Sequence, residues 1–136
     1  MNWARFLLAT LAAGFAASLS DWLFMGTLFH DKYLLTPEIW RPSVAAGNER
    51  KAIMYSTLLG FLTCGAFVLL CARLGFHAYH NTLKLAVAVW LIAPLPMIIT
   101  NHLFIKMHPA LAVSHSLGWL AKLIVTALLV VWIFPR

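Results

Sequence analysis

The chain has 136 residues, of which 62% are hydrophobic and 10% are charged. A soluble domain has roughly 45–50% apolar and 25% charged residues, so this composition excludes an ordinary soluble domain and is typical of an integral membrane protein. The formal net charge of +6 would suggest a nucleic-acid partner in a soluble protein. Here the lysines and arginines mostly flank apolar segments, so we interpret them as anchors at the surface of a lipid bilayer, with no nucleic acid bound.

Four apolar segments follow one another along the chain. Each is close to the roughly 20 residues that a transmembrane helix needs. The chain is too short for two domains, so we expect one transmembrane domain over residues 1–136. The predicted fold class is all-α: an antiparallel bundle of four transmembrane helices. The segments cover residues 6–29, 52–72, 83–105 and 110–134, approximately.

The first segment has some features of a cleaved signal peptide. Arg5 precedes an apolar stretch, and Ala16-Ala17-Ser18 could serve as a cleavage site. Apolar character continues past this point to Phe29, which gives about 23 residues, enough to span a bilayer. We therefore expect the first helix to be retained.

The connection from residue 30 to 51 is the one long one, and it contains the sequence TPEIWRP. Thr36 as an N-cap and Pro37 at the first helical position predict a short helix. Trp40 is expected to anchor that helix at the membrane interface. The number of basic residues is similar on the two sides of the membrane, so the sequence does not determine the orientation of the chain.

Glycine, proline and polar residues mark the ends of the later segments. Gly75 is placed to end the second helix in the left-handed conformation. Asn81 or Thr82 is expected to cap the third helix. Pro94 and Pro96 lie inside the third helix and predict a kink, because proline lacks the N–H group that an α-helix uses.

Two charged side chains lie well inside predicted membrane segments. Asp21 lies about 12 Å and Lys122 about 18 Å from the same interface, and side chains tilt toward the N-terminus of their helix, so the two can meet across antiparallel helices. An unpaired charge at this depth would cost several kcal/mol. The pair could be a structural clasp, or a site for a substrate, an ion or a proton. A neutral Asp21 without an ion pair is the third possibility.

The histidines suggest that this pair belongs to a larger polar pocket. His102 and His115 lie on antiparallel neighbouring helices at a similar shallow depth, so their imidazoles are expected to approach one another. Asn101 belongs to the same layer. Together with Asp21 and Lys122, these residues predict a pocket that opens toward one face of the membrane.

Several chemistries could use such a pocket. Asp21, His102 and His115 could ligate a transition metal, two imidazoles could ligate a haem, and either histidine could relay protons. The simpler interpretation is that shallow histidines bind interfacial water or lipid headgroups. The six histidines lack the clustered HxxxH and HxxHH spacing of membrane di-iron oxygenases, and the sequence contains no nucleophile elbow, phosphate loop or HExxH motif.

Three stretches carry a family resemblance: MNWARFLLATLAAGF, DWLFMGTLFHDKY and PMIITNHLF. They resemble a widespread group of small bacterial four-helix membrane proteins classed as a domain of unknown function. The resemblance implies a multi-pass protein of the bacterial inner membrane and no known activity; it does not extend to Asp21, His102 or His115. The matching residues are Asn2-Trp3, Phe24 with Gly26, Leu28 and Phe29, and Asn101. A second, weaker resemblance is to anthrone-oxygenase-like membrane proteins, which also have four helices and a late polar Asn.

Three functions remain open. The first is binding or transport of a small solute, ion or proton, with Asp21 as the central charge and Lys122 as its partner. The second is a membrane-embedded enzyme or redox protein that acts on a lipophilic substrate through the histidines. The third is an accessory subunit whose polar residues serve assembly. A single bundle of this size has little room for a conduction path, so we expect a homo-oligomer or a larger membrane partner.

Overall fold

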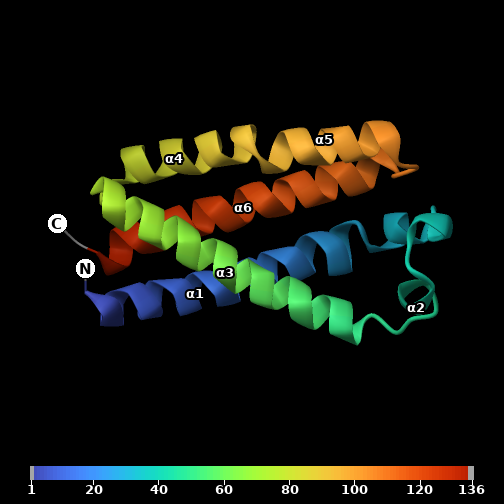
Figure 1. Cartoon of the computed structure of the whole chain (residues 1–136), viewed down its shortest axis with the longest axis horizontal. Helices are drawn as coiled ribbons and strands as arrows, with labels where there is room; N and C mark the ends of the chain where they lie inside the picture. Colours follow the sequence, from blue (N-terminus) through green and yellow to red (C-terminus); the bar gives the residue numbers. More distant parts are fainter. Residues whose placement is uncertain (1, 135–136) are drawn as a thin grey trace.

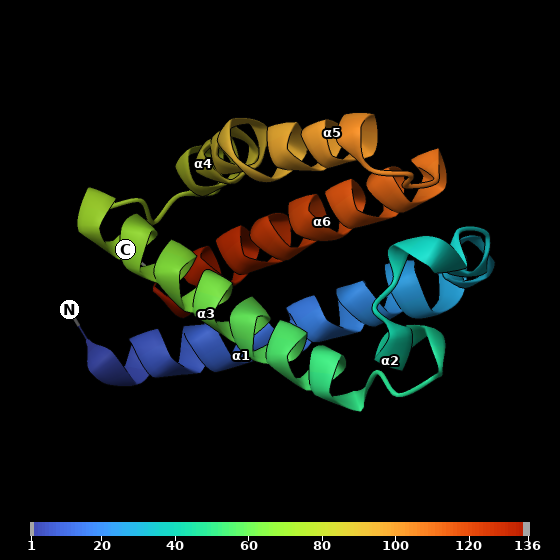
Figure 2. The ribbon, with the colours of Figure 1, turned by 45° about the vertical axis from the view of Figure 1, so that its right-hand side comes forward.

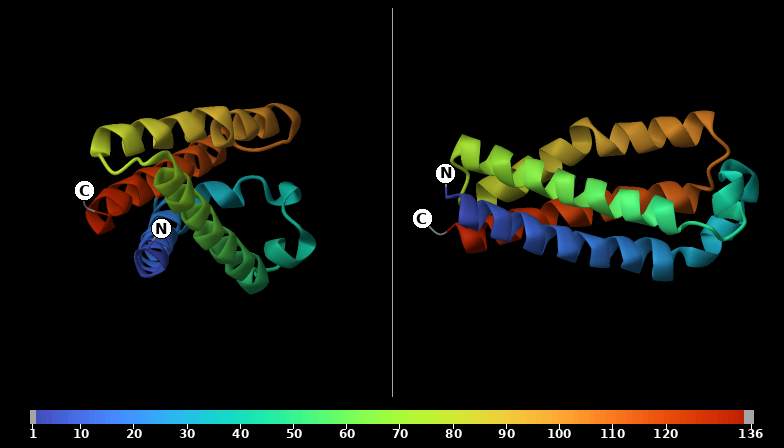
Figure 3. Two further views of the ribbon diagram at one scale, coloured as in Figure 1. Left: turned by 60° about the vertical axis from the view of Figure 1, so that its left-hand side comes forward. Right: turned by 60° about the horizontal axis from the view of Figure 1, so that its bottom comes forward.

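The computed structural model describes residues 2–134, and the regular structure within them is entirely helical (Figure 1). Four helical spans are long and apolar enough to cross a membrane, and each runs antiparallel to the one before it (Figure 1). The predicted fold class is therefore confirmed, and the chain is a multi-pass membrane protein. Both chain termini lie at one end of the bundle, and the long connection lies at the other (Figure 3). The spans are Trp3–Leu28, Arg50–Leu74, Tyr79–Phe104 and Pro109–Ile133.

The first span changes its helical geometry at Asp21. Helix α1 (Trp3–Asp21) begins at Asn2, whose side-chain oxygen accepts a hydrogen bond from the backbone N–H of Arg5 at 3.2 Å. It continues without a break into a π-helix, η1 (Trp22–Leu28). Wider helical turns of this kind are rare and occur often at functional sites. The sequence did not predict this change of geometry.

The connection after the first span contains three short helical turns. They are the 3₁₀ turns η2 (His30–Leu34) and η3 (Pro37–Ile39) and the one-turn helix α2 (Pro42–Ala45). The single interfacial helix that the sequence predicted is therefore not confirmed. Thr36 precedes Pro37 as expected, but its side chain makes no capping hydrogen bond. The Trp40 ring stacks on Tyr33 instead, and its indole N–H donates to the Tyr33 carbonyl oxygen at 3.0 Å.

The second span is one helix, α3 (Arg50–Leu74), and it ends as the sequence predicted. Gly75 has a φ angle of 67°, in the left-handed region that glycine adopts without strain. The backbone N–H of Phe76 then donates to the carbonyl oxygen of Cys71 at 2.9 Å. Together with the bond from the Gly75 N–H to the Ala72 carbonyl oxygen, it forms the hydrogen-bond pattern of a Schellman motif.

The third span is broken into α4 (Tyr79–Ile92) and α5 (Pro94–Phe104). The break falls at Ala93, whose φ and ψ of −126° and −67° leave the helical region just before Pro94. The expected proline kink is thus present. The predicted cap at Asn81 or Thr82 is wrong, because the helix already begins at Tyr79 and the Thr82 hydroxyl donates back to the carbonyl oxygen of Ala78.

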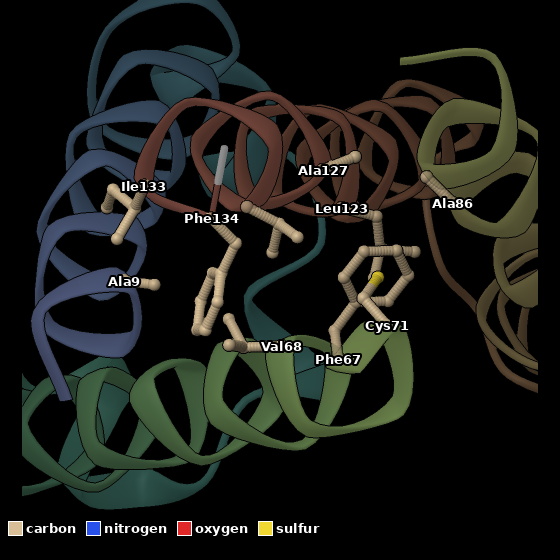
Figure 4. Packing of buried hydrophobic residues seen from close by; sticks show 10 residues of the cluster. Ala9, Phe67, Val68, Cys71, Ala86, Leu123, Ala127, Ile133 and Phe134 are labelled. Carbon is tan, nitrogen blue, oxygen red and sulfur yellow. The ribbon is translucent and has the colours of Figure 1, made fainter. Parts of the chain in front are cut away.

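Helix α6 (Pro109–Ile133) is the centre of the bundle. It packs against α1, α3, α4 and α5, and Figure 2 shows it between α1 on one side and α4 and α5 on the other. The largest apolar core lies in the half of the bundle nearer the termini (Figure 4). Cys71 belongs to this core, Cys64 packs with Ala13 and Ala17, and both cysteines are free. The polar groups of α6 lie mainly beyond this core, toward the long connection.

Candidate functional site

The two charges inside the membrane spans meet. Lys122 Nζ lies 2.9 Å from Asp21 Oδ2, which is the length of a charge-assisted hydrogen bond. The Lys122 side chain is 9% exposed and that of Asp21 is 23% exposed. Asp21 is the last residue of α1, and Lys122 lies in the middle of α6, against which α1 packs. The structure therefore places a largely buried ion pair between the two helices.

The Lys122 ammonium lies where three helices come together. It stands over the Trp119 ring, with Nζ 5.0 Å from the ring centroid, a distance typical of a cation–π contact. Helix α3 also comes close through Gly60, where a Cβ atom would lie 3.8 Å from Nζ. Helix α3 is therefore the third helix beside the ammonium.

The Asp21 carboxylate has one oxygen that the ion pair does not use. This atom, Oδ1, faces Gly118, where a Cβ atom would lie 3.5 Å from it and 3.9 Å from Met25 Cε. Within residues 2–134, no side chain donates a hydrogen bond to Oδ1. The Asp21 side chain is 23% exposed, and it keeps an acceptor oxygen beside the ion pair that no other side chain occupies within residues 2–134.

One face of α6 carries the site. Ser114, Gly118, Lys122 and Thr126 recur every four residues, and all four are buried. Residues four apart lie one above another on a helix, so they form a single stripe of small and polar groups. The Thr126 hydroxyl donates to the Lys122 carbonyl oxygen at 2.7 Å and lies 3.4 Å from Cys64 Sγ. This spacing is visible in the sequence, but it was not used there to predict the site.

A tyrosine from the connection covers the end of this stripe. Tyr33 Oη lies 3.3 Å from His115 Nε2 and 3.4 Å from Ser114 Oγ. The Tyr33 ring is held in place by Trp40, as described above. Sequence reasoning missed Tyr33, because it lies in an irregular segment with no periodicity that relates it to α6.

The environment of Tyr33 favours a neutral phenol. Burial raises the pKa of Tyr33 above its ordinary value of 10.0; the hydrogen bond with Ser114 lowers it, and the negative charge of Asp21 raises it further. A neutral phenol keeps its proton, so it can donate a hydrogen bond to His115 or to Ser114. Tyr33 therefore links the α6 stripe to the connection at neutral pH.

Replacing Tyr33 with phenylalanine tests this link. At pH 8 we expect Tyr33→Phe to lower the free energy of unfolding in detergent by about 1 kcal/mol, because hydrogen bonds are lost. The difference should narrow as the pH rises above about 10, because the unfolded wild-type chain then loses its phenolic proton more readily than the folded one. Tyr55→Phe, at an exposed tyrosine, is the control. If the free energies of unfolding of Tyr33→Phe and the wild type differ by the same amount at every pH, burial does not raise the pKa of Tyr33.

Within residues 2–134, none of the other predicted site residues makes a hydrogen bond or salt bridge with Asp21 or Lys122. His102 lies at the end of α5, where its Nδ1 is 2.9 Å from the carbonyl oxygen of Met107, and Asn101 lies half-buried beside it. His115 instead contacts Tyr33. Within residues 2–134 no group of three or more histidine, cysteine, aspartate or glutamate side chains could hold a metal ion. The predicted metal site of Asp21, His102 and His115 is therefore not assembled in this structure.

The fold and the ion pair together define a small four-helix membrane protein with paired charges inside its spans. The family model described as "Protein of unknown function (DUF1761)" matches residues 8–131, and the chain belongs to this family. The family resemblance noted in the sequence is thereby confirmed. No curated protein and no solved structure matches the chain. The family match gives no support to the weaker resemblance to anthrone-oxygenase-like membrane proteins.

Proposed function

We propose that this protein binds a small ion, above all a proton, at the Asp21–Lys122 pair in the cell membrane, and that it takes part in moving it. The observation that carries the proposal is the unused Oδ1 oxygen of Asp21, an acceptor beside a buried ion pair. Ionisable side chains within membrane spans are costly and usually mark an ion or proton pathway.

The polar groups beside the pair favour access from one side of the membrane. His115 lies within electrostatic reach of both Asp21 and Lys122, and it contacts Tyr33, which belongs to the long connection. In the other direction the stripe ends at Thr126, beside the apolar core, which continues to Ile133 and Phe134 (Figure 4). Binding from the side of the connection therefore needs little rearrangement. Transfer across the whole membrane would need movement, for which the π-helix next to Asp21 is suited.

A second candidate is an accessory or assembly subunit in which the pair is only a clasp. The direct 2.9 Å contact between α1 and α6 favours this alternative, because it holds two helices together without any ligand. The enzyme or redox alternative depended on a layer formed by His102 and His115. The contacts of these two rings with Met107 and Tyr33 give that alternative no support.

Proton flux into liposomes tests the proposal. The purified full chain is reconstituted with a pH-sensitive dye trapped inside, and a potassium gradient with valinomycin supplies the driving voltage. We expect wild-type flux well above that of liposomes without protein. Asp21→Asn should reconstitute but lose this flux, because the amide does not take up a proton at neutral pH. Asp31→Asn, the same change in the exposed connection, is the matched control and should keep it.

A charge swap separates the proposed function from the clasp. Asp21→Lys combined with Lys122→Asp keeps two opposite charges between α1 and α6 but moves the carboxylate to another helix. If the pair is a binding site, the swapped protein accumulates and remains inactive. A swapped protein that accumulates with wild-type flux, or a wild-type flux no greater than that of empty liposomes, would contradict the proposal.

A further inference from the structure

An open cleft of about 580 Å³ lies at the end of the bundle that contains the start of α1 and the end of α6. It is far from the ion pair, because Arg5 and Asp21 are separated by about 24 Å along α1 at 1.5 Å per residue. Its walls come from α1, the end of α3, the turn before α4 and the end of α6. The residues that matter here are Trp3, Arg5, Arg73, His77 and Phe134.

The cleft carries positive charge without a compensating carboxylate side chain. Arg5 comes from the first turn of α1 and Arg73 from the last turn of α3, and both are exposed. The four acidic residues of the chain lie elsewhere: Asp21 in the ion pair, and Asp31, Glu38 and Glu49 in the connection at the opposite end. Within the described residues, neither arginine makes a salt bridge. Both guanidinium groups are thus available to an external anion.

His77 supplies an independent indication of a ligand. Its Nδ1 atom is buried and has no hydrogen-bond partner within residues 2–134. Its ring stacks on Phe134, with centroids 5.9 Å apart and an angle of 24° between the planes. Buried polar atoms are nearly always paired with protein, water or a ligand, so each exception calls for an explanation. His77 lines the cleft, so a turn of its ring toward the cleft would bring this nitrogen to an acceptor oxygen bound there.

We infer that this cleft binds the phosphate of an anionic phospholipid headgroup. The planar guanidinium groups of Arg5 and Arg73 match the oxygens of a phosphate, and His77 adds a third donor once its ring turns toward the cleft. Both arginines lie at the ends of membrane spans, the level at which headgroups lie. Trp3 and Phe134 give the cleft an apolar wall, which suits the upper part of a lipid rather than a free anion. Basic pockets between transmembrane helices bind such headgroups.

Native mass spectrometry of the full chain in mild detergent tests this inference. The probes are phosphatidylglycerol and phosphatidylcholine with identical acyl chains. We expect the wild type to bind phosphatidylglycerol about tenfold more tightly, and Arg5→Gln combined with Arg73→Gln to abolish the preference. Lys84→Gln is the matched control, since Lys84 is an exposed cation at the same end of the bundle outside the cleft. His77→Phe keeps a ring against Phe134 but removes the nitrogen, so it should weaken the preference.

Three results would overturn the inference. Equal binding of the two lipids by the wild type would show that the cleft does not recognise an anionic headgroup. If Lys84→Gln loses as much of the preference for phosphatidylglycerol as the double arginine variant does, the lipid is attracted by the general positive charge of this end and not by a specific site. Displacement of phosphatidylglycerol by millimolar inorganic phosphate would make the ligand a soluble phosphate. Because both arginines are exposed, the helix content and elution volume of the variants should match the wild type.

Discussion

Lys122→Ala is expected to lower the free energy of unfolding in detergent by about 3 kcal/mol, one of the two largest effects of a single substitution in this chain. The change leaves the Asp21 carboxylate between α1 and α6 without its partner, and the 23% exposure of that side chain allows only partial solvation. It also removes the cation from the Trp119 ring. Unfolding by sodium dodecyl sulfate, followed by circular dichroism, measures the effect.

A double-mutant cycle shows whether this loss comes from the pair. Asp21→Leu combined with Lys122→Met removes both charges at similar volume, and we expect it to be within about 1 kcal/mol of the wild type, or more stable. The coupling energy between the two sites follows from the cycle. Lys84→Ala, at an exposed position on α4, should change stability by no more than about 0.5 kcal/mol. If Lys122→Ala costs as little as Lys84→Ala, the ion pair does not stabilise the bundle.

The four-helix fold could be predicted because lipid restricts a short apolar chain to few structures. Every backbone polar group must be satisfied within the membrane, so each long apolar segment becomes a helix. Local signals also predicted the end of α3, at Gly75, and the break before α5, at Pro94. The π-helix after Asp21 was not predictable in this way, because it depends on which carbonyl each N–H meets, and no residue type requires it. The connection formed three short turns for a similar reason: Thr36 and Pro37 permit a helix but do not extend one.

The candidate site was predictable only in part. Depth and side-chain tilt were enough to bring Asp21 and Lys122 together on antiparallel helices. They were not enough for His102, because depth does not say which way a side chain faces around its helix, and the break at Ala93 resets that direction for α5. Tyr33 could not be found either, since its partner His115 is 82 positions away and Tyr33 lies in an irregular segment.

The second large effect is expected at Gly14, where α1 crosses α3. A Cβ atom at Gly14 would overlap Phe61 Cδ1 and lie 2.6 Å from Phe61 Cγ, far closer than real contacts allow. Gly14→Ala must therefore displace the whole Phe61 ring and its edge-to-face contact with Phe15. We expect a loss of about 2 kcal/mol, which exceeds the gain of up to about 1 kcal/mol that alanine brings to a helix.

Gly60→Ala makes the same chemical change in α3 without the same crowding. A Cβ atom there meets only Lys122 Nζ, at an ordinary 3.8 Å, so this variant should be as stable as the wild type or slightly more stable. The ring itself can be tested by adding Phe61→Ala to Gly14→Ala, because the smaller side chain leaves room for the new methyl group. We expect the loss caused by Gly14→Ala to be much smaller in that background. An equal loss with and without the Phe61 ring would mean that Gly14 is required for its backbone and not for the close approach of α3.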